Sequence, residues 1–351
     1  MKINVLLIGS ASLAALAATE ASAADPVMAI EPAPANYVEV CDAFGAGYFY
    51  IPGTETCLNI GGYVRFETQF GGIQTGSADD SDWSPYTKAN FQITAKTDTE
   101  LGTLTSVMVP EFYVYANGDD SEFKLDNLYV DLGDTVSVRV GYFKSYWNDD
   151  LWGELDNIDN TTRYNSVRLA YNADNFVLGV QADVLPTAIT GTATPKMAVS
   201  GRIGYQPSDS HYARFDFAYD TQTENYALRP WMGFGIGPGT FEIAGLYESG
   251  FISFAPDFTA DNWNDSPIAG TYMKYAVAAN YYFNVTESLI LAPQTQYNVA
   301  SNDKTFWEAG ATADWSVVDN FHVRANLNYA FLDDDWNQQN WFGWLRLERD
   351  F

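Results

Sequence analysis

The chain has 351 residues, of which 47% are hydrophobic and 16% aromatic, and its 45 acidic and 18 basic side chains give a formal charge of −27. This acidity argues against duplex nucleic acid as a partner, because phosphate backbones are bound by clustered Lys and Arg. With 10 Trp, 23 Tyr and 22 Phe, the chain is also far too aromatic for a disordered protein. It is therefore expected to fold around buried apolar surface.

Residues 1–23 have the three parts of a secretory signal peptide. Lys2 supplies the positive charge, Ile3 to Ala18 form the apolar stretch, and Ala21-Ser22-Ala23 form a small-residue cleavage site. We therefore expect an exported protein that begins near Ala24. No run of 18 or more apolar residues follows, which excludes membrane-spanning helices after the signal.

Residues 24–57 form a lead-in that starts with a Pro- and Ala-rich stretch and contains both cysteines of the chain, Cys41 and Cys57. Thiols of exported proteins tend to be oxidised, so we expect a disulfide that closes this segment and restricts the unfolded chain by roughly 3 kcal/mol. The alternative is two unpaired thiols or a metal-binding pair, although no His or further Cys lies nearby to complete a zinc site.

From Leu58 onward, apolar and polar residues alternate, which is typical of strands with one apolar and one polar face. The first such segment, which contains Ile60, Val64 and Phe66, exceeds ten residues and is longer than most globular strands. About sixteen such segments follow one another, separated by Gly, Asn, Asp or Pro clusters. The clearest lie at 87–97, 136–142, 165–171, 176–184, 197–205, 215–219, 241–247, 273–283 and 321–331, and the least regular at 101–115, 226–236 and 305–317.

The polar face of these segments bears charged side chains, and aromatic residues such as Tyr171 and Tyr205 border the apolar face. A secreted sandwich or solenoid also alternates, but the strands of a sandwich are short. A closed barrel with lipid outside and water inside accounts for both faces and pairs every backbone group. We therefore predict that residues 58–351 form an all-β, antiparallel transmembrane β-barrel of about 16 strands.

The segment from Lys144 to Tyr164 is long for a connection between strands, which favours a functional loop. If it folds into the lumen, its carboxylates form a negative lip at the narrowest point, where rings of charge act on passing ions. An acidic loop at the surface is the alternative. The candidate residues are Asp149, Asp150, Glu154, Asp156 and Asp159.

We expect a basic wall across the channel from these acids, giving a transverse field that orients dipolar solutes. The alternative for each base is a position at the rim or in a turn, paired with a nearby acid. Because acids outnumber bases in the chain, we predict a preference for cations. By strand parity, the lumen-facing bases are Arg65, Lys88, Lys96, Arg168, Arg202, Arg214 and Arg324.

The sequence contains two histidines, His211 and His322, and no HExxH or CxxC motif. We therefore expect no catalytic site, no cofactor and no metal. For the function of the barrel, an enzyme or adhesin of the outer membrane is the least favoured alternative.

Three parts of the chain resemble a known family. YVEVCDAFGAGYFYIPGTETCLNIGGYVR, from Tyr37 to Arg65, resembles the N-terminal signature of the alphaproteobacterial general-diffusion porins of Rhizobiales and Brucella. NLYVDLGDTVSVRVGYFKSY, from Asn127 to Tyr146, is similar to the strand pair that leads into the constriction loop of that family. The terminal Phe351 resembles the assembly signal of bacterial outer-membrane barrels.

The resemblance implies a barrel of sixteen strands in the bacterial outer membrane, in contact with lipid and lipopolysaccharide, that assembles as a homotrimer with its third loop folded inward. Sixteen strands leave a water-filled interior, so the expected activity is passive diffusion of small hydrophilic solutes and ions. A solute-specific porin with a saturable binding site is the alternative.

Overall fold

A computed structural model describes residues 39–71, 83–115, 121–149, 151–153, 162–185, 196–254, 257–258, 270–331 and 341–351. Within these ranges the chain forms sixteen long strands, two strands of two residues and one short 3-10 turn. None of the helices there is long and apolar enough to cross a membrane. The elements are η1 (Asp42–Phe44), β1 (Phe49–Tyr50), β2 (Cys57–Phe70), β3 (Ser84–Thr99), β4 (Gly102–Tyr115), β5 (Ser121–Gly133), β6 (Val136–Lys144), β7 (Arg163–Ala173), β8 (Phe176–Leu185), β9 (Lys196–Ser208), β10 (His211–Asp220), β11 (Asn225–Ile236), β12 (Gly239–Glu248), β13 (Asp257–Phe258), β14 (Thr271–Thr286), β15 (Leu289–Ala300), β16 (Thr305–Val318), β17 (Phe321–Phe331) and β18 (Trp341–Asp350).

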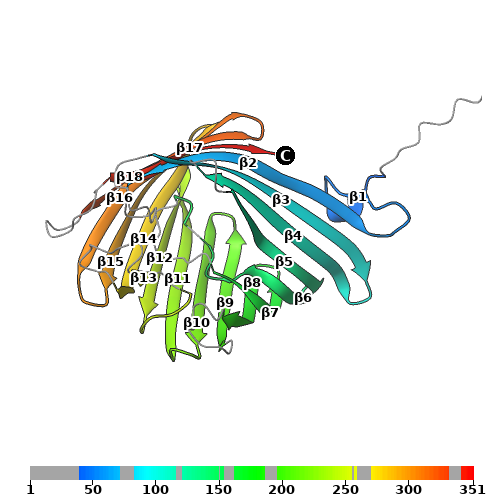
Figure 1. The fold of residues 1–351 in the computed structure, drawn as a ribbon, viewed down its shortest axis with the longest axis horizontal. Coiled ribbons are helices and arrows are strands. Elements are labelled where there is room, and N and C mark those ends of the chain that lie inside the picture. The colour runs from blue at the N-terminus through cyan, green and yellow to red at the C-terminus, as the bar shows by residue number, and fades with distance from the viewer. Residues whose placement is uncertain are drawn as a thin grey trace, which may run out of the picture. The chain divides into compact units, whose positions relative to one another are not determined.

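Each long strand pairs antiparallel with the next one along the chain, and the sheet closes because β18 pairs with β2. Figure 1 shows this closure, with the red C-terminal strand beside the blue β2. A closed sheet has no free edge, so its backbone groups are paired even where lipid surrounds it. The predicted antiparallel barrel of about 16 strands is confirmed, and β2 begins at Cys57, one residue before the predicted boundary.

The two faces of the strands differ as the alternation predicts. On β2, Val64 is 47% and Phe66 44% exposed on the outside, whereas the neighbouring Glu67 on the inner face is 1% exposed. The same contrast recurs on β6, where Val138 and Val140 face outward and flank Arg139. The outer surface is therefore apolar and the inner surface is lined by hydrogen-bonded polar groups, the reverse of a soluble sandwich.

The least regular segments of the sequence are strands too, and the structure explains their irregularity. In β4 the register shifts between Val109 and Pro110, because proline cannot donate to the ladder. In β11 the inward-facing Trp231 is large and apolar, which obscures the alternation, yet Met232 and Phe234 remain exposed on the outer face. In β16, a bulge between Ser316 and Val318 also interrupts the alternation.

One end of the barrel consists of tight turns. The two-residue connections after β7 and β16 contain Asp174 and Asn320, both with positive φ, as turns matching the twist of a hairpin require. The connections at the other end are longer. The predicted signal peptide and the first part of the lead-in lie outside the described residues.

Candidate functional site

The connection between β6 and β7, the third at the long-loop end, turns into the barrel. The backbone amide of Trp152 donates to Glu242 on β12 at 2.9 Å, and the carbonyl oxygen of Gly153 accepts hydrogen bonds from Thr312 on β16 and Asn326 on β17. These strands lie far around the barrel from β6 and β7. The loop therefore crosses the lumen, and the predicted inward fold of the third loop is confirmed.

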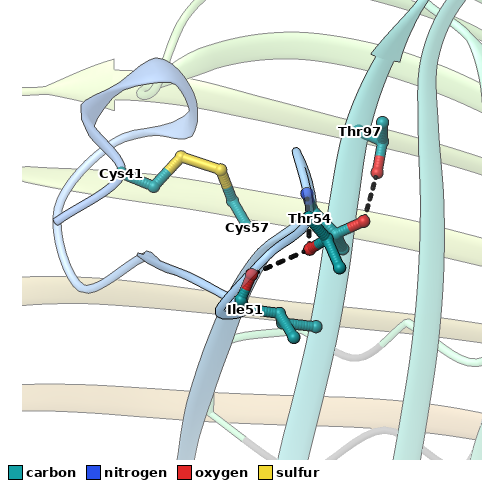
Figure 2. The surroundings of a disulfide bond; sticks show 6 residues. Cys41, Ile51, Thr54, Cys57 and Thr97 are labelled. Atoms are coloured by element: carbon teal, nitrogen blue, oxygen red, sulfur yellow. Dashed lines mark hydrogen bonds between the residues drawn. A yellow bond between two sulfur atoms is a disulfide. The ribbon is translucent and has the colours of Figure 1, made fainter. Parts of the chain in front are cut away.

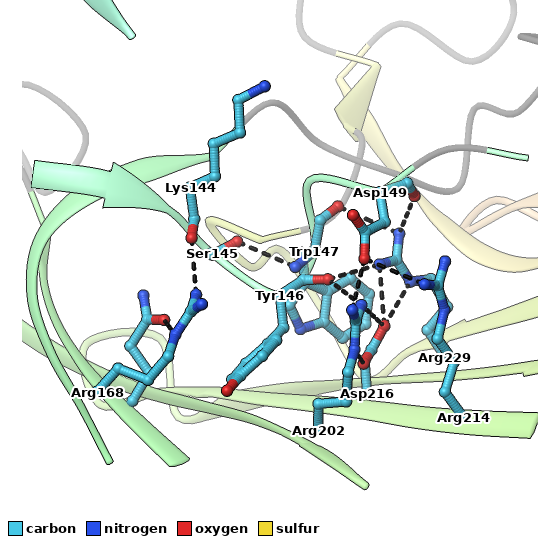
Figure 3. Close-up of polar contacts among 11 residues, drawn as sticks. Lys144, Ser145, Tyr146, Trp147, Asp149, Arg168, Arg202, Arg214, Asp216 and Arg229 are labelled. Atoms are coloured by element: carbon cyan, nitrogen blue, oxygen red, sulfur yellow. Dashed lines mark hydrogen bonds and ion pairs between the residues drawn. The ribbon is translucent and has the colours of Figure 1, made fainter. Parts of the chain in front are cut away.

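A row of arginines ties the start of this loop to the barrel wall, as Figure 3 shows. Arg202 on β9 and Arg229 on β11 donate hydrogen bonds to the loop backbone, and Arg168 on β7 donates to Lys144, the last residue of β6 before the loop. The acceptors are the carbonyl oxygens of Lys144, Tyr146, Trp147 and Asp149, at 2.6 to 3.1 Å. Because a loop in the lumen cannot pair its backbone in the sheet, these side chains satisfy its carbonyl groups.

A buried carboxylate holds two of the three arginines in place. Asp216 on β10 is fully buried and accepts from Arg202 Nε at 2.6 Å and from Arg229 Nη2 at 2.9 Å. Arg229 is itself fully buried. The planar guanidinium suits this arrangement, because it presents five donors in fixed directions.

Asp149 is the one predicted loop acid that the structure describes; Asp150, Glu154, Asp156 and Asp159 lie outside the described residues. Its carboxylate contacts Arg202 at 2.5 Å and Arg214 at 3.2 Å. Burial alone would raise the pKa of Asp149, but these guanidinium groups outweigh it and hold that pKa below its ordinary value. Asp149 is therefore bonded directly to the basic wall, instead of facing it across the channel as predicted.

The other predicted bases have partners on several parts of the inner wall. Arg324 pairs with Asp314 at 2.7 Å and lines a cavity of about 320 Å³ on the β16–β17 side of the loop. Arg65 and Lys88 pair with Glu348 and Glu111, each at 2.6 Å, on the inner wall formed by β2, β3, β4 and β18. Lys96 lies near the turn end, over the rings of Phe44 and Tyr48. Four of the seven predicted bases thus lie beside the loop: Arg168, Arg202, Arg214 and Arg324. Arg65, Lys88 and Lys96 have other neighbours.

Two arginines of this site are absent from the predicted wall. Arg139 lies between Val138 and Val140, so the alternation alone places it on the polar face. Arg229 belongs to the irregular segment before Pro230, where parity is hard to assign. Its role depends on contacts with a loop more than 70 residues away in the sequence, for which the sequence carries no signal.

Apolar side chains pack the loop against the inner wall. Trp147 and Leu151 are almost fully buried and belong to one cluster with Trp231. Trp147 therefore anchors the loop. Inward-facing alanines on the wall strands leave the space for this cluster: Ala198, Ala218, Ala227, Ala244, Ala276, Ala278, Ala300 and Ala330.

A second connection, after β12, also folds inward where it is described. Ile252 and Phe254 are buried in the same cluster, and Phe254 packs edge-on against Tyr164 with ring centroids 5.4 Å apart. The Tyr164 hydroxyl donates to the Ser253 carbonyl at 2.7 Å, and the Ser253 hydroxyl donates to Asp220 at 3.1 Å. Two loops therefore narrow the barrel on the side of β7 to β12.

The lead-in is closed by the expected disulfide, shown in Figure 2. Cys41 and Cys57 are bonded, with Cα atoms 5.9 Å apart, and both are buried. Thr56 and Thr97 join this segment to β3 through a hydroxyl–hydroxyl hydrogen bond of 3.0 Å. The described ranges contain no group of three or more His, Cys, Asp or Glu residues that could hold a metal ion.

The C-terminal residue lies at the closing seam. The Phe351 amide donates to the Gly62 carbonyl at 3.0 Å, and the Gly62 amide donates to the Phe351 carbonyl at 3.1 Å. The half-exposed Phe351 ring packs against Phe91 with centroids 5.7 Å apart. The chain end thus continues the pairing between the last long strand and the first.

Comparisons with known proteins agree with this architecture. The chain is 36% identical to outer membrane protein IIIA of Rhizobium leguminosarum bv. viciae, over 95% of this chain and 91% of that protein. It is 28% identical to porin Omp2b of Brucella suis biovar 1 (strain 1330), over the full length of both. Among solved structures, the outer membrane channel DcaP of Acinetobacter baumannii has the same fold, with a TM-score of 0.63, 12% identity and coverage of 86% of this chain and 99% of that chain.

The sequence profile of the Porin subfamily matches residues 25–348, which is nearly the whole chain. The resemblance noted in the sequence is therefore confirmed, and the outer-membrane names of the relatives place this protein in the same membrane. With its closed barrel and inward-folded third loop, the chain belongs to the Porin subfamily, and it is an outer-membrane porin channel and not an enzyme.

Proposed function

We propose that the channel lets small hydrophilic solutes and ions diffuse passively through a constriction made by the third loop. The observation that carries this proposal is the crossing of the lumen by the loop, whose residues 145–149 are bonded to the arginine row and whose residues 151–153 reach β12, β16 and β17. Cavities of about 310 and 320 Å³ lie against both sides of Asn148 and Asp149. Spaces of this size suit small solutes.

Conductance of the purified protein in a planar lipid bilayer tests this proposal. Stepwise current increments in KCl, together with liposome swelling in small sugars but not in large ones, are expected of a passive channel. A folded barrel, recognised by its heat-modifiable gel mobility, that conducts no ions would contradict it.

The cation preference remains a proposal that rests on the net charge and the acidic loop. Asp149 does not carry it, because two arginines neutralise that carboxylate. The other four loop acids would have to supply the field. Reversal potentials in a KCl gradient measure the preference directly, and a preference for anions would refute the argument from acid count.

A homotrimer in contact with lipid and lipopolysaccharide is also proposed. The outer face of β3 to β6 has an apolar depression of about 380 Å³, lined by residues that include Met108, Leu128, Val130 and Val140. A surface of this kind suits apolar partners such as a second subunit or acyl chains. The mass of the detergent-solubilised protein, measured by light scattering, tests the trimer.

We further propose that the two chain ends direct export and assembly of the barrel. Residues 1–23 are proposed as the export signal, which mass spectrometry of the exported protein tests through an N-terminus at Ala24. Phe351 is proposed as the assembly signal, supported by its place at the seam of the barrel. A Phe351→Ala variant is expected to reach the outer membrane in reduced amount.

A further inference from the structure

Guanidinium groups and aromatic rings alternate along the inner wall beside the loop. The Arg139 guanidinium lies 5.6 Å from the Phe143 ring centroid, and Arg168 lies between Phe143, at 4.9 Å, and Tyr146, at 3.9 Å. Arg202 follows on the same tyrosine, at 5.1 Å. The rings space three positive charges along one surface, which we call the arginine ladder (Arg139, Arg168 and Arg202).

The two outer members of the ladder have carboxylate partners. Arg139 donates to Asp131 through Nε and Nη2, at 2.9 and 2.6 Å. Arg202 contacts Asp216 and Asp149 at 2.6 and 2.5 Å. Their charges are therefore largely compensated within the protein.

Arg168, in the middle, has no carboxylate within ion-pair distance among the described residues. Its Nε donates to the amide oxygen of Gln181 and its Nη2 to the Lys144 carbonyl, both at 2.7 Å, while Nη1 has no hydrogen-bond partner in the described ranges. The nearest route to an acid is indirect, through the hydrogen bond from Gln181 to Asp183. Within the part of the chain that the structure describes, the ladder thus carries one positive charge without a carboxylate partner at its centre.

The strand register places two arginines of the ladder directly opposite each other, of which Arg139 alone has a carboxylate partner among the described residues. Arg139 and Arg168 occupy directly opposite positions on β6 and β7, and like charges at opposite positions destabilise a sheet. Gly179 provides the space for the intervening Tyr146, because a Cβ at that position would overlap the tyrosine hydroxyl. The packing of the wall around Tyr146 therefore keeps the arginines of the ladder close together.

The ladder lines the cavity of about 310 Å³ between the loop and the wall of β3 to β9. Gln92 and Asn127 line the same cavity, and Gln92 is exposed to the lumen. Amide and guanidinium groups are the donors that carboxylates and phosphates prefer, and a guanidinium can bind them through two parallel hydrogen bonds. Among the described residues, the cavity thus combines a guanidinium group without a carboxylate partner, neutral donors and access from the lumen.

We propose that the arginine ladder is a binding site for small oxyanions that carry a carboxylate or phosphate group. The anion accepts a hydrogen bond from Arg168 Nη1 and compensates the charge between the two opposite strands. This inference rests on the proposed channel function and adds to it a saturable site for one class of solute, whatever the overall preference between cations and anions.

The test is block of single-channel KCl current by inorganic phosphate and, in a separate arm, by succinate, both at constant ionic strength. In the wild type we expect a saturable decrease in current with either anion; with only one of them, the site distinguishes phosphate from carboxylate. In Arg168→Gln the half-blocking concentration should rise at least about tenfold, because a charge-assisted hydrogen bond is lost. Arg168→Lys, which keeps the charge but not the planar fork, should give an intermediate value.

Two matched variants separate the site from general effects. Arg324→Gln removes one positive charge from the other side of the loop and should leave the half-blocking concentration unchanged. Gln92→Glu adds a negative charge to the cavity without contacting the loop anchors and should weaken the block. Wild-type current without saturable block, or equal block in wild type and Arg168→Gln, overturns the oxyanion site alone, whereas a barrel without conductance overturns the channel proposal as well.

Discussion

Replacing Arg229 by Met should release the start of the third loop from the barrel wall. Arg229 is fully buried and joins three loop carbonyl groups to the carboxylate of Asp216. Methionine fills similar space but donates no hydrogen bond. The substitution therefore removes three hydrogen bonds between loop and wall, leaves the contacts of Arg202 with Tyr146 and Asp149, and does not alter the pairing of the strands.

The free-energy cost of Arg229→Met depends on the hydrogen-bond partners that Asp216 and the loop carbonyl groups keep. Removing one member of a buried ion pair costs about 3–5 kcal/mol. Asp216 keeps Arg202 at 2.6 Å, and water in the lumen can reach the released carbonyl groups, so we expect a value near the lower end. About 3 kcal/mol increases the population of detached loop more than a hundredfold.

Single-channel recording and liposome swelling measure the consequence. Arg229→Met should show larger or fluctuating conductance in KCl and should admit sugars that the wild type excludes. Gel mobility before and after heating checks that the barrel has folded.

Arg346→Met is the matched control, because Arg346 also forms a mostly buried ion pair, with Glu67, but at the seam where β18 pairs with β2. This control should lower the temperature of heat modification and leave the conductance unchanged. A folded Arg229→Met channel with the conductance and size limit of the wild type would refute the role of the arginine row in holding the loop.

Three further expectations concern other parts of the molecule. The arginine partners of Asp149 hold the pKa of its carboxyl below the ordinary value of 3.8, despite its burial. The ion pairs that anchor the loop are therefore present above pH 3.8 and are lost as the pH falls through the lowered pKa. Conductance should be constant from pH 5 to 8 and change only in stronger acid, and a change near pH 6 would contradict this. Val167→Arg on the lipid-facing surface should destabilise the barrel by up to about 2–4 kcal/mol and lower its heat-modification temperature, whereas Gln92→Arg in the lumen should not; equal effects would argue against the assignment of the two faces. Replacing Cys41 and Cys57 together by Ala should cost roughly 3 kcal/mol in the lead-in segment, seen as faster proteolysis there with unchanged barrel mobility, and protease resistance equal to the wild type would count against a stabilising disulfide.

The alternation of residue types was sufficient to predict the barrel. Val138 and Val140 face outward and Glu67 inward because a strand directs successive side chains to opposite faces, whatever its neighbours are. The same local rule correctly placed Arg168 and Arg202 on the lumen side. It was weakest at the bulge beside Pro110 and around Trp231, where a change of register or a packed loop interrupts the period.

The pairing of charges could not be predicted in this way. Asp149 was expected to face the basic wall across the channel, but it bonds to Arg202 and Arg214 because the loop crosses the lumen beside them. Arg229 was missed for the same reason, since its partners are loop carbonyl groups contributed by a distant part of the chain.

The order of residue types was enough to predict which residues form strands, which face of each strand meets lipid and which meets water, and that the lead-in cysteines would be oxidised. These properties depend on local periodicity and on the compartment. The path of the third loop, the partners of Asp149 and the position of Arg168 among neutral acceptors became visible in the folded barrel alone. These contacts arise when closure of the barrel brings β7, β9 and β11 against a loop that has no periodic pattern of its own.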